Sequence, residues 1–155
     1  MIRAFQLFWE SIGDTPKTAT YTRSRFTHIL DSTKKAESFF RKMWNKELLT
    51  IQEEVYVIFV DNDNRIIEWM LLHKGGTRKC FIDIQLLYKF AYKFDASGIF
   101  IAHNHPKGSI KTSPEDDNIT LEIKVIADKL GFRFLDHIII TSKKYYSYYE
   151  SGMLD

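Results

Sequence analysis

The chain has almost no cysteine and no long apolar run. Its one cysteine, Cys80, can form no disulfide within the chain and has no CxxC partner for zinc or redox chemistry, so we expect a buried thiol. No stretch approaches the roughly 18 apolar residues that a membrane-spanning helix needs. The opening letters MIRAFQLFWE contain neither a sustained apolar segment nor a signal-peptide cleavage pattern. These absences predict a cytoplasmic protein with no membrane contact.

An excess of charge of one sign is also lacking. The sequence has 22 basic and 20 acidic residues, a formal net charge of +2, and no basic block. Nucleic-acid-binding domains carry a clustered basic footprint, so charge does not support a nucleic-acid partner, although it leaves one possible. The 155 residues are 45% hydrophobic and 27% charged, as in a single compact globular domain without repeats or linkers.

Hydrophobic periodicity predicts alternating helices and strands. Residues 1–27 form an N-terminal extension in which alternating residues indicate one or two edge strands around the turn at 13–17. Over 28–155 the patterns predict, in chain order, a helix within 31–45, a hairpin over 53–72, a short strand over 78–82, a helix over 84–94, a buried strand over 99–103, a helix over 114–130 and a buried strand over 133–141. This order predicts an α/β fold, a mixed β-sheet flanked by helices in a single domain.

The most informative stretch is IFIAHNHPKGSIKTSPEDDN. His103 and His105 are two residues apart at the end of a strand, so their imidazoles can point the same way. After the turn at 106–108, Ser113 can cap the next helix and Asp116 lies at its third position, where it can face the histidines. Three protein ligands with a fourth position open to water are typical of a catalytic zinc, so the spacing predicts a hydrolytic metal site.

A simpler explanation exists for each residue taken alone. Ser113 followed three residues later by Asp116 is very nearly a capping box, which satisfies backbone amides without any metal. A single histidine at a strand end is more often a hydrogen-bonded or surface residue than a ligand. The conjunction of HxH with SxxD at this spacing, in contrast, arises by chance on the order of once in several thousand chains of this length. Capping and metal binding are compatible in one site.

On these residues the chain resembles the JAMM (MPN+) metalloproteases, and within them most closely the RadC branch. His103, His105, Ser113 and Asp116 match the JAMM pattern of HxH, seven residues, SxxD, and the family's HNHPSG and PSxxD are HNHPKG and TSPED here. The resemblance covers about residue 28 to the end. It extends to the segments ILDSTKKAESFF, QEEVYVIFVDNDNRII, ASGIFIAHNHPKG and FLDHIIIT.

The sequence departs from the family in three places. Residues 1–27 have no counterpart to the N-terminal helix-hairpin-helix region of longer RadC proteins, so DNA contacts attributed to that region are not expected. Lys107 replaces the usual serine and Thr112 the usual proline. Neither is a ligand position, but Lys107 adds a cation beside the predicted metal and leaves the substrate preference open.

The resemblance implies a JAB/MPN-like (cytidine-deaminase-like) fold and a zinc-dependent amide hydrolysis, with one Zn²⁺ per chain held by His103, His105 and Asp116. It also implies a glutamate from an early strand as general base, and alignment puts Glu53 there. Glu54 is the alternative, because an alignment error of one residue would exchange the faces of the strand on which the two glutamates lie. Ser113 would donate a hydrogen bond to the developing oxyanion.

Two further groups of residues have less specific interpretations. Asp136 and His137 match the family's usual DH, and we expect His137 to make a supporting or structural hydrogen bond rather than to bind metal. The tyrosine-rich segment 145–152 is expected to form a strand and a lid over the core. It has only two neighbouring lysines, Lys143 and Lys144, and base stacking would need a basic groove.

Three classes of function stay open on the sequence. The first is a metallohydrolase that cleaves a peptide or isopeptide bond in an unidentified protein or peptide substrate. The second is a role in DNA repair or DNA processing, suggested by the RadC name; the letters HNH do not support it, because HNH nucleases spread their residues over a longer element. The third is a zinc-binding scaffold without turnover. The presence of every expected ligand argues against the third.

Overall fold

The computed structural model describes residues 28–75 and 82–154, and all structural statements below concern these residues. The predicted edge strands within 1–27, nearly all of the short strand predicted over 78–82, and Cys80 lie outside the described residues.

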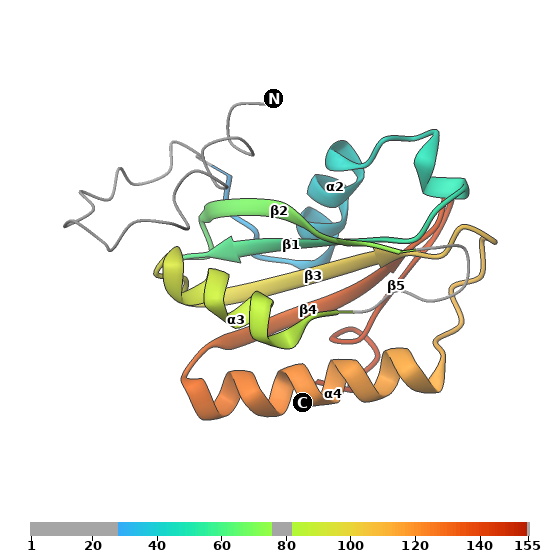
Figure 1. The fold of residues 1–155 in the computed structure, drawn as a ribbon. Helices are drawn as coiled ribbons and strands as arrows, with labels where there is room; N and C mark the ends of the chain where they lie inside the picture. The colour runs from blue at the N-terminus through green and yellow to red at the C-terminus, as the bar shows by residue number, and fades with distance from the viewer. Residues whose placement is uncertain (1–27, 76–81, 155) are drawn as a thin grey trace, which may run out of the picture.

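A five-stranded mixed sheet forms the centre of the fold (Figure 1). Its strands are β1 (Glu54–Val60), β2 (Ile66–Lys74), β3 (Gly98–Asn104), β4 (Arg133–Ile140) and β5 (Tyr145–Ser147), in the spatial order β2-β1-β3-β4-β5. Neighbouring strands are antiparallel except β3 and β4, which run parallel. A parallel pair needs a long crossover, and the longest described helix supplies it.

Helices cover both faces of this sheet (Figure 1). Helix α2 (Thr33–Met43) packs on one face, and α3 (Ile84–Lys93) and α4 (Pro114–Leu130) pack on the other. A short 3₁₀ turn, η1 (Leu48–Thr50), connects α2 to β1. We refer to the two sides as the α2 face and the α4 face.

Consecutive strand residues contribute to opposite faces. Val57 and Ile101 belong to the core beneath α3 and α4, whereas Ile58 and Phe100 belong to the core beneath α2. All seven positions of β1 and of β3 are buried, because helices cover both sides of these central strands. Whether a polar residue at a strand end faces α2 or α4 therefore follows from its position in the alternation.

Helix α4 begins and ends as its sequence predicts. Ser113 is the N-cap, Pro114 occupies the first turn, and Ser113 and Asp116 form a reciprocal capping box. At the other end Gly131 adopts a left-handed conformation, with φ at 79°, which favours glycine. Ser32 caps α2 with its side chain, which accepts from the backbone N–H of Lys35.

The structure confirms the predicted α/β class, the first helix, the hairpin, both later helices and both buried strands. The expected strand in the tyrosine-rich segment is the edge strand β5, only three residues long. The turn η1 was not predicted, because a three-residue helix is too short to show a hydrophobic period. No helix in the described part of the chain is long and apolar enough to cross a membrane.

Candidate metal centre

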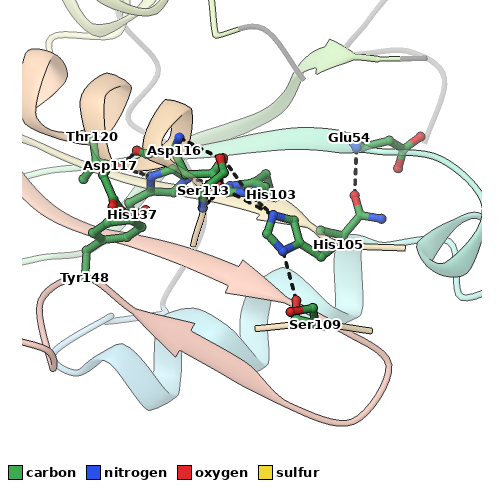
Figure 2. Close-up of polar contacts among 11 residues, drawn as sticks. Glu54, His103, His105, Ser109, Ser113, Asp116, Asp117, Thr120, His137 and Tyr148 are labelled. Atoms are coloured by element: carbon green, nitrogen blue, oxygen red, sulfur yellow. Dashed lines mark hydrogen bonds and ion pairs between the residues drawn. The ribbon is translucent and has the colours of Figure 1, made fainter. Parts of the chain in front are cut away.

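Three side chains converge where β3 ends and α4 begins (Figure 2). The Nε2 atoms of His103 and His105 lie 3.0 Å apart. The Asp116 carboxylate approaches both rings, with Oδ1 at 3.3 Å from His103 Nε2 and Oδ2 at 3.6 Å from His105 Nε2. The structure therefore brings together all three predicted ligands, from the end of β3, the loop that follows it and the first turn of α4.

These separations fit one small metal ion. A tetrahedral zinc with bonds of about 2.0 to 2.1 Å holds its ligand atoms about 3.3 Å apart. The three observed distances scatter around that value, and the candidate ligand atoms all lie within 4.8 Å of one another. Imidazole nitrogen and carboxylate oxygen are the donors that zinc takes in catalytic sites. The residues present thus fit the group that the sequence predicts.

The first turn of α4 orients Asp116. Its Oδ2 accepts hydrogen bonds from the Ser113 backbone N–H at 2.9 Å and from the Ser113 hydroxyl at 2.7 Å. Oδ1 is the oxygen nearer His103. Burial alone would raise the pKa of Asp116, but its contacts with His105 and His103 and the hydrogen bonds from Ser113 lower it far below its ordinary value of 3.8. Asp116 is therefore ionised, as a metal ligand must be.

The loop after β3 orients His105. Its Nδ1 lies 2.9 Å from the backbone carbonyl oxygen of Ser109 (Figure 2), and since a carbonyl only accepts, Nδ1 carries the proton. The lone pair of the neutral ring is then on Nε2, toward Asp116. About 17% of the His105 side chain and 19% of the Asp116 side chain are exposed. The predicted access to solvent is thus present on this side of the site.

His103 lies deeper and is supported by residues from other elements. The residue is only 3% exposed, and burial lowers the pKa of His103 to about 4. Its Nδ1 lies 2.7 Å from Nε2 of His137 on β4, and His137 Nδ1 lies 2.6 Å from the hydroxyl of Thr120 on α4. The ring of Tyr148 stacks on the other side of His137, with centroids 5.1 Å apart. The predicted hydrogen bond of His137 is confirmed, whereas Thr120 and Tyr148 were missed by the sequence analysis.

The register of β1 and β3 separates the two candidate bases. Val55 lies opposite His103, so Glu53 continues the alternation on the face that carries His103 and His105. Burial raises the pKa of Glu53 above its ordinary value; the charge of Asp116 adds to this effect, and the charges of His105 and Lys107 oppose it.

Glu54 faces the opposite side. It is 2% exposed, one carboxylate oxygen lies 3.4 Å from Lys74 Nζ, and the other has no hydrogen-bond partner. Figure 2 shows its carboxylate directed away from the histidines. Glu53 is thus the candidate on the site's face, and its role as a base stays a prediction.

Asn104, between the two histidines, was not assigned a role from the sequence. Its side-chain oxygen accepts from the backbone N–H of Glu54 at 2.7 Å, and its amide nitrogen donates to the carbonyls of Leu49 and Gln52, each at 2.8 Å. Asn104 therefore fixes the segment that leads to Glu53 relative to β3. The sequence did contain a signal for this role, because Asn104 is a polar residue at a position that strand alternation assigns to the core.

The fold and the site define the class of this protein: an α/β domain with a candidate His-His-Asp metal centre at the end of a central strand. The family model of the RadC-like JAB domain matches residues 29–153. The chain belongs to the RadC-like JAB domain family, whose fold is that of the JAMM superfamily, which includes hydrolases.

Curated relatives agree with this assignment. A UPF0758 protein of Flavobacterium johnsoniae is 39% identical over 101 residues, which cover 65% of this chain and 44% of the relative. A UPF0758 protein of Aquifex aeolicus is 36% identical over 103 residues, covering 66% and 45%. One from Streptococcus pyogenes serotype M1 is 35% identical over 126 residues, covering 81% and 54%. The chain spans about half the length of these relatives.

Proposed function

We propose that this chain is a zinc metallohydrolase of the JAMM type that cleaves a peptide or isopeptide bond. The observation that carries the proposal is the convergence of His103, His105 and Asp116 at a partly exposed edge, with Glu53 on the same face of the sheet. Membership of the RadC-like JAB family supports it. Three ligands are one fewer than a closed structural zinc site uses, so a position is left for water.

A bound zinc lowers the pKa of its water toward about 7 and polarises a substrate carbonyl. The residues of the protein carry out the other steps. Glu53 accepts the proton of the attacking water and returns it to the leaving amine, and its raised pKa suits this exchange. His103, His105 and Asp116 hold the ion, and the protein substrate reaches it from the exposed side of His105 and Asp116.

Ser113 is proposed to stabilise the developing oxyanion. In the structure its hydroxyl donates to Asp116 Oδ2 at 2.7 Å and accepts from the Asp116 backbone N–H at 3.1 Å. Donation to an oxyanion requires the hydroxyl hydrogen to rotate away from Asp116. Removing such a donor in other enzymes costs about 3 kcal/mol of transition-state stabilisation.

A matched pair of variants tests the proposed base. Glu53→Gln keeps the shape of the side chain but removes its basic oxygen, so it is expected to lower turnover by about 10²- to 10⁴-fold without loss of bound zinc. Glu54→Gln makes the same chemical change one residue away, on the α2 face, and is expected to leave turnover unchanged.

The assay is a panel of peptide and isopeptide-linked reporters beside single- and double-stranded DNA, each with and without a chelator. The proposal predicts chelator-sensitive cleavage of a peptide or isopeptide reporter. Cleavage that Glu53→Gln leaves intact would show that Glu53 is not the base. Chelator-sensitive cleavage of DNA alone would support DNA processing instead, and full zinc occupancy without any cleavage would favour the scaffold.

A further inference from the structure

We infer that Thr120 and His137 are positioning residues that fix the proton of His103 on Nδ1, so that its Nε2 presents a lone pair to the metal. The inference rests on the proposed metal site and adds residues that bind no metal themselves. It follows from the donors and acceptors along a buried chain of three contacts that runs from α4 through β4 to β3 (Figure 2).

The chain of contacts starts at a group that can only accept. The Thr120 hydroxyl lies 2.6 Å from the backbone carbonyl oxygen of Asp116 and 2.6 Å from His137 Nδ1. A hydroxyl has one hydrogen, and the carbonyl has none to offer, so the hydroxyl donates to the carbonyl. It must then accept from His137, which places a proton on His137 Nδ1.

The next contact, between His137 and His103, fixes the position of the His103 ring proton. His137 is fully buried, and a second ring proton would give it a charge that its contacts with Thr120 and His103 do not neutralise. Its Nε2 therefore carries a lone pair, 2.7 Å from His103 Nδ1. His103 must donate in this contact, which leaves the lone pair of its neutral ring on Nε2.

The result is a lone pair on His103 Nε2 that faces the candidate site, 3.0 Å from His105 Nε2 and 3.3 Å from Asp116 Oδ1. A cation at this point would accept that lone pair. The chain of contacts also closes on itself, because Asp116 provides both a candidate ligand and the carbonyl at which the chain starts.

Packing around Thr120 and His137 holds the His137 ring in this orientation. Thr120 and His137 have no exposed surface. The Tyr148 ring lies nearly parallel to His137, at 14°, and its hydroxyl donates to Asp117 Oδ1 at 2.8 Å. Rotation of the His137 ring about its χ2 angle would therefore displace a buried tyrosine that is anchored to the first turn of α4.

A purely structural role for Thr120 is the competing explanation. Threonine hydroxyls commonly bond to the carbonyl four residues earlier in a helix, without any function. On that explanation Thr120→Val, which keeps the shape and removes the hydroxyl, affects only stability. On ours, His137 loses the acceptor that holds its proton on Nδ1, His103 is no longer forced to donate, and metal affinity falls.

The first test measures zinc affinity by competition with a chromophoric chelator at neutral pH. Thr120→Val is expected to weaken zinc binding by about 10- to 100-fold, the usual cost of losing an outer hydrogen-bond partner of a metal ligand, and Thr120→Ser to restore it to within about threefold. Thr141→Val is the control, because Thr141 is also buried and hydrogen-bonded but lies outside the chain of contacts. Equal affinity in Thr120→Val and wild type would overturn the inference.

The second test records the histidine protons directly in the zinc-free protein, by two-bond ¹⁵N–¹H NMR correlations of the side chains. We expect His137 and His103 both to carry the proton on Nδ1 in wild type and in Thr120→Ser, and His137 to lose this preference in Thr120→Val. A wild-type His137 protonated on Nε2 would overturn the inference. Failure of wild type to bind zinc, in contrast, would overturn the proposed function, while the spectra would still decide the arrangement of protons.

Discussion

The two faces of the sheet use neighbouring residues for different tasks. Three pairs of consecutive polar residues on the central strands divide between the faces: Glu53 and Glu54 at the start of β1, His103 and Asn104 at the end of β3, and His137 and Asp136 in the middle of β4. The first member of each pair faces α4 and lies at or near the candidate site. The second faces α2 and holds elements of the fold together. Strand alternation therefore assigns the candidate metal site and the stabilising contacts to opposite faces of the sheet.

The polar groups of the α2 face are nearly all saturated. Buried Asp136 accepts from the hydroxyls of Thr33 at 2.8 Å and Ser147 at 2.7 Å and from the backbone N–H of Tyr149 at 3.0 Å. It thereby ties α2 and the β5 region to β4. Asn104 connects β3 to the segment before β1 through its own three bonds. On the α4 face, two imidazole nitrogens and a carboxylate converge within 3.0 to 3.6 Å instead, so this is the side that can receive a cation.

The largest expected effect is the loss of the metal. His103→Ala removes a ligand and should reduce bound zinc from about one per chain to nearly none, because two remaining ligands do not form a stable site. Elemental analysis of protein loaded with zinc and then desalted measures this directly. His28→Ala, at an exposed histidine far along the chain from the cluster, should keep its zinc. Equal zinc content in wild type and His103→Ala would contradict the assignment of the metal site to the α4 face.

The next largest effect is on stability. Asp136→Ala leaves two buried hydroxyls and a backbone N–H without their acceptor and should lower the free energy of unfolding by about 3 kcal/mol. The zinc affinity of the folded protein should change little, since Asp136 faces away from the site. Denaturant titration and chelator competition on the same sample check both statements. A large fall in affinity with unchanged stability would contradict the assignment of Asp136.

A smaller effect is expected at Asn104. Asn104→Asp replaces the amide that donates to the carbonyls of Leu49 and Gln52 by an oxygen, and should cost about 2 kcal/mol of unfolding free energy. Because the same segment leads to Glu53, turnover should fall while zinc content stays near that of wild type. Zinc loss without loss of turnover or stability would show that Asn104 acts on the ligands instead.

The smallest effect is the dependence of zinc affinity on pH. A protonated imidazole cannot bind zinc, and although burial lowers the pKa of His105, the Asp116 carboxylate and the Ser109 carbonyl raise it above its ordinary value of 6.5. Affinity should therefore fall about tenfold per pH unit as the pH drops below the pKa of His105. The slope should steepen near pH 4, where the pKa of His103 lies. Calorimetric titrations in several buffers measure the affinity and the protons released, and a flat profile from neutral to acidic pH would contradict a histidine site.

Much of the fold was predictable because its elements carry strong periodic patterns and clear caps. Ser113, Pro114 and Gly131 mark the ends of α4, and the apolar runs of β1, β3 and β4 mark buried strands. The candidate metal ligands were predictable because His103 and His105 are close in sequence and Asp116 lies at a fixed position after its helix cap. Local spacing was sufficient for these residues.

The supporting residues were not predictable in the same way. Thr120 and Tyr148 meet His137 only because α4, β4 and the segment after β5 pack together, and nothing local to either residue indicates it. The choice between Glu53 and Glu54 needed the register of β1 against β3, which one sequence does not supply. These contacts depend on how segments distant in the sequence pack against one another, and local sequence patterns do not specify that packing.

A crystal structure of the zinc-loaded protein, with anomalous differences measured above and below the zinc absorption edge, tests the central claim most directly. The account predicts one anomalous peak per chain, within about 2.0 to 2.2 Å of His103 Nε2, His105 Nε2 and an Asp116 carboxylate oxygen. It also predicts Glu53 on the same side of the sheet as the peak, and Glu54 and Asp136 on the other. A zinc bound elsewhere, or no peak at this cluster with zinc in excess, would contradict it.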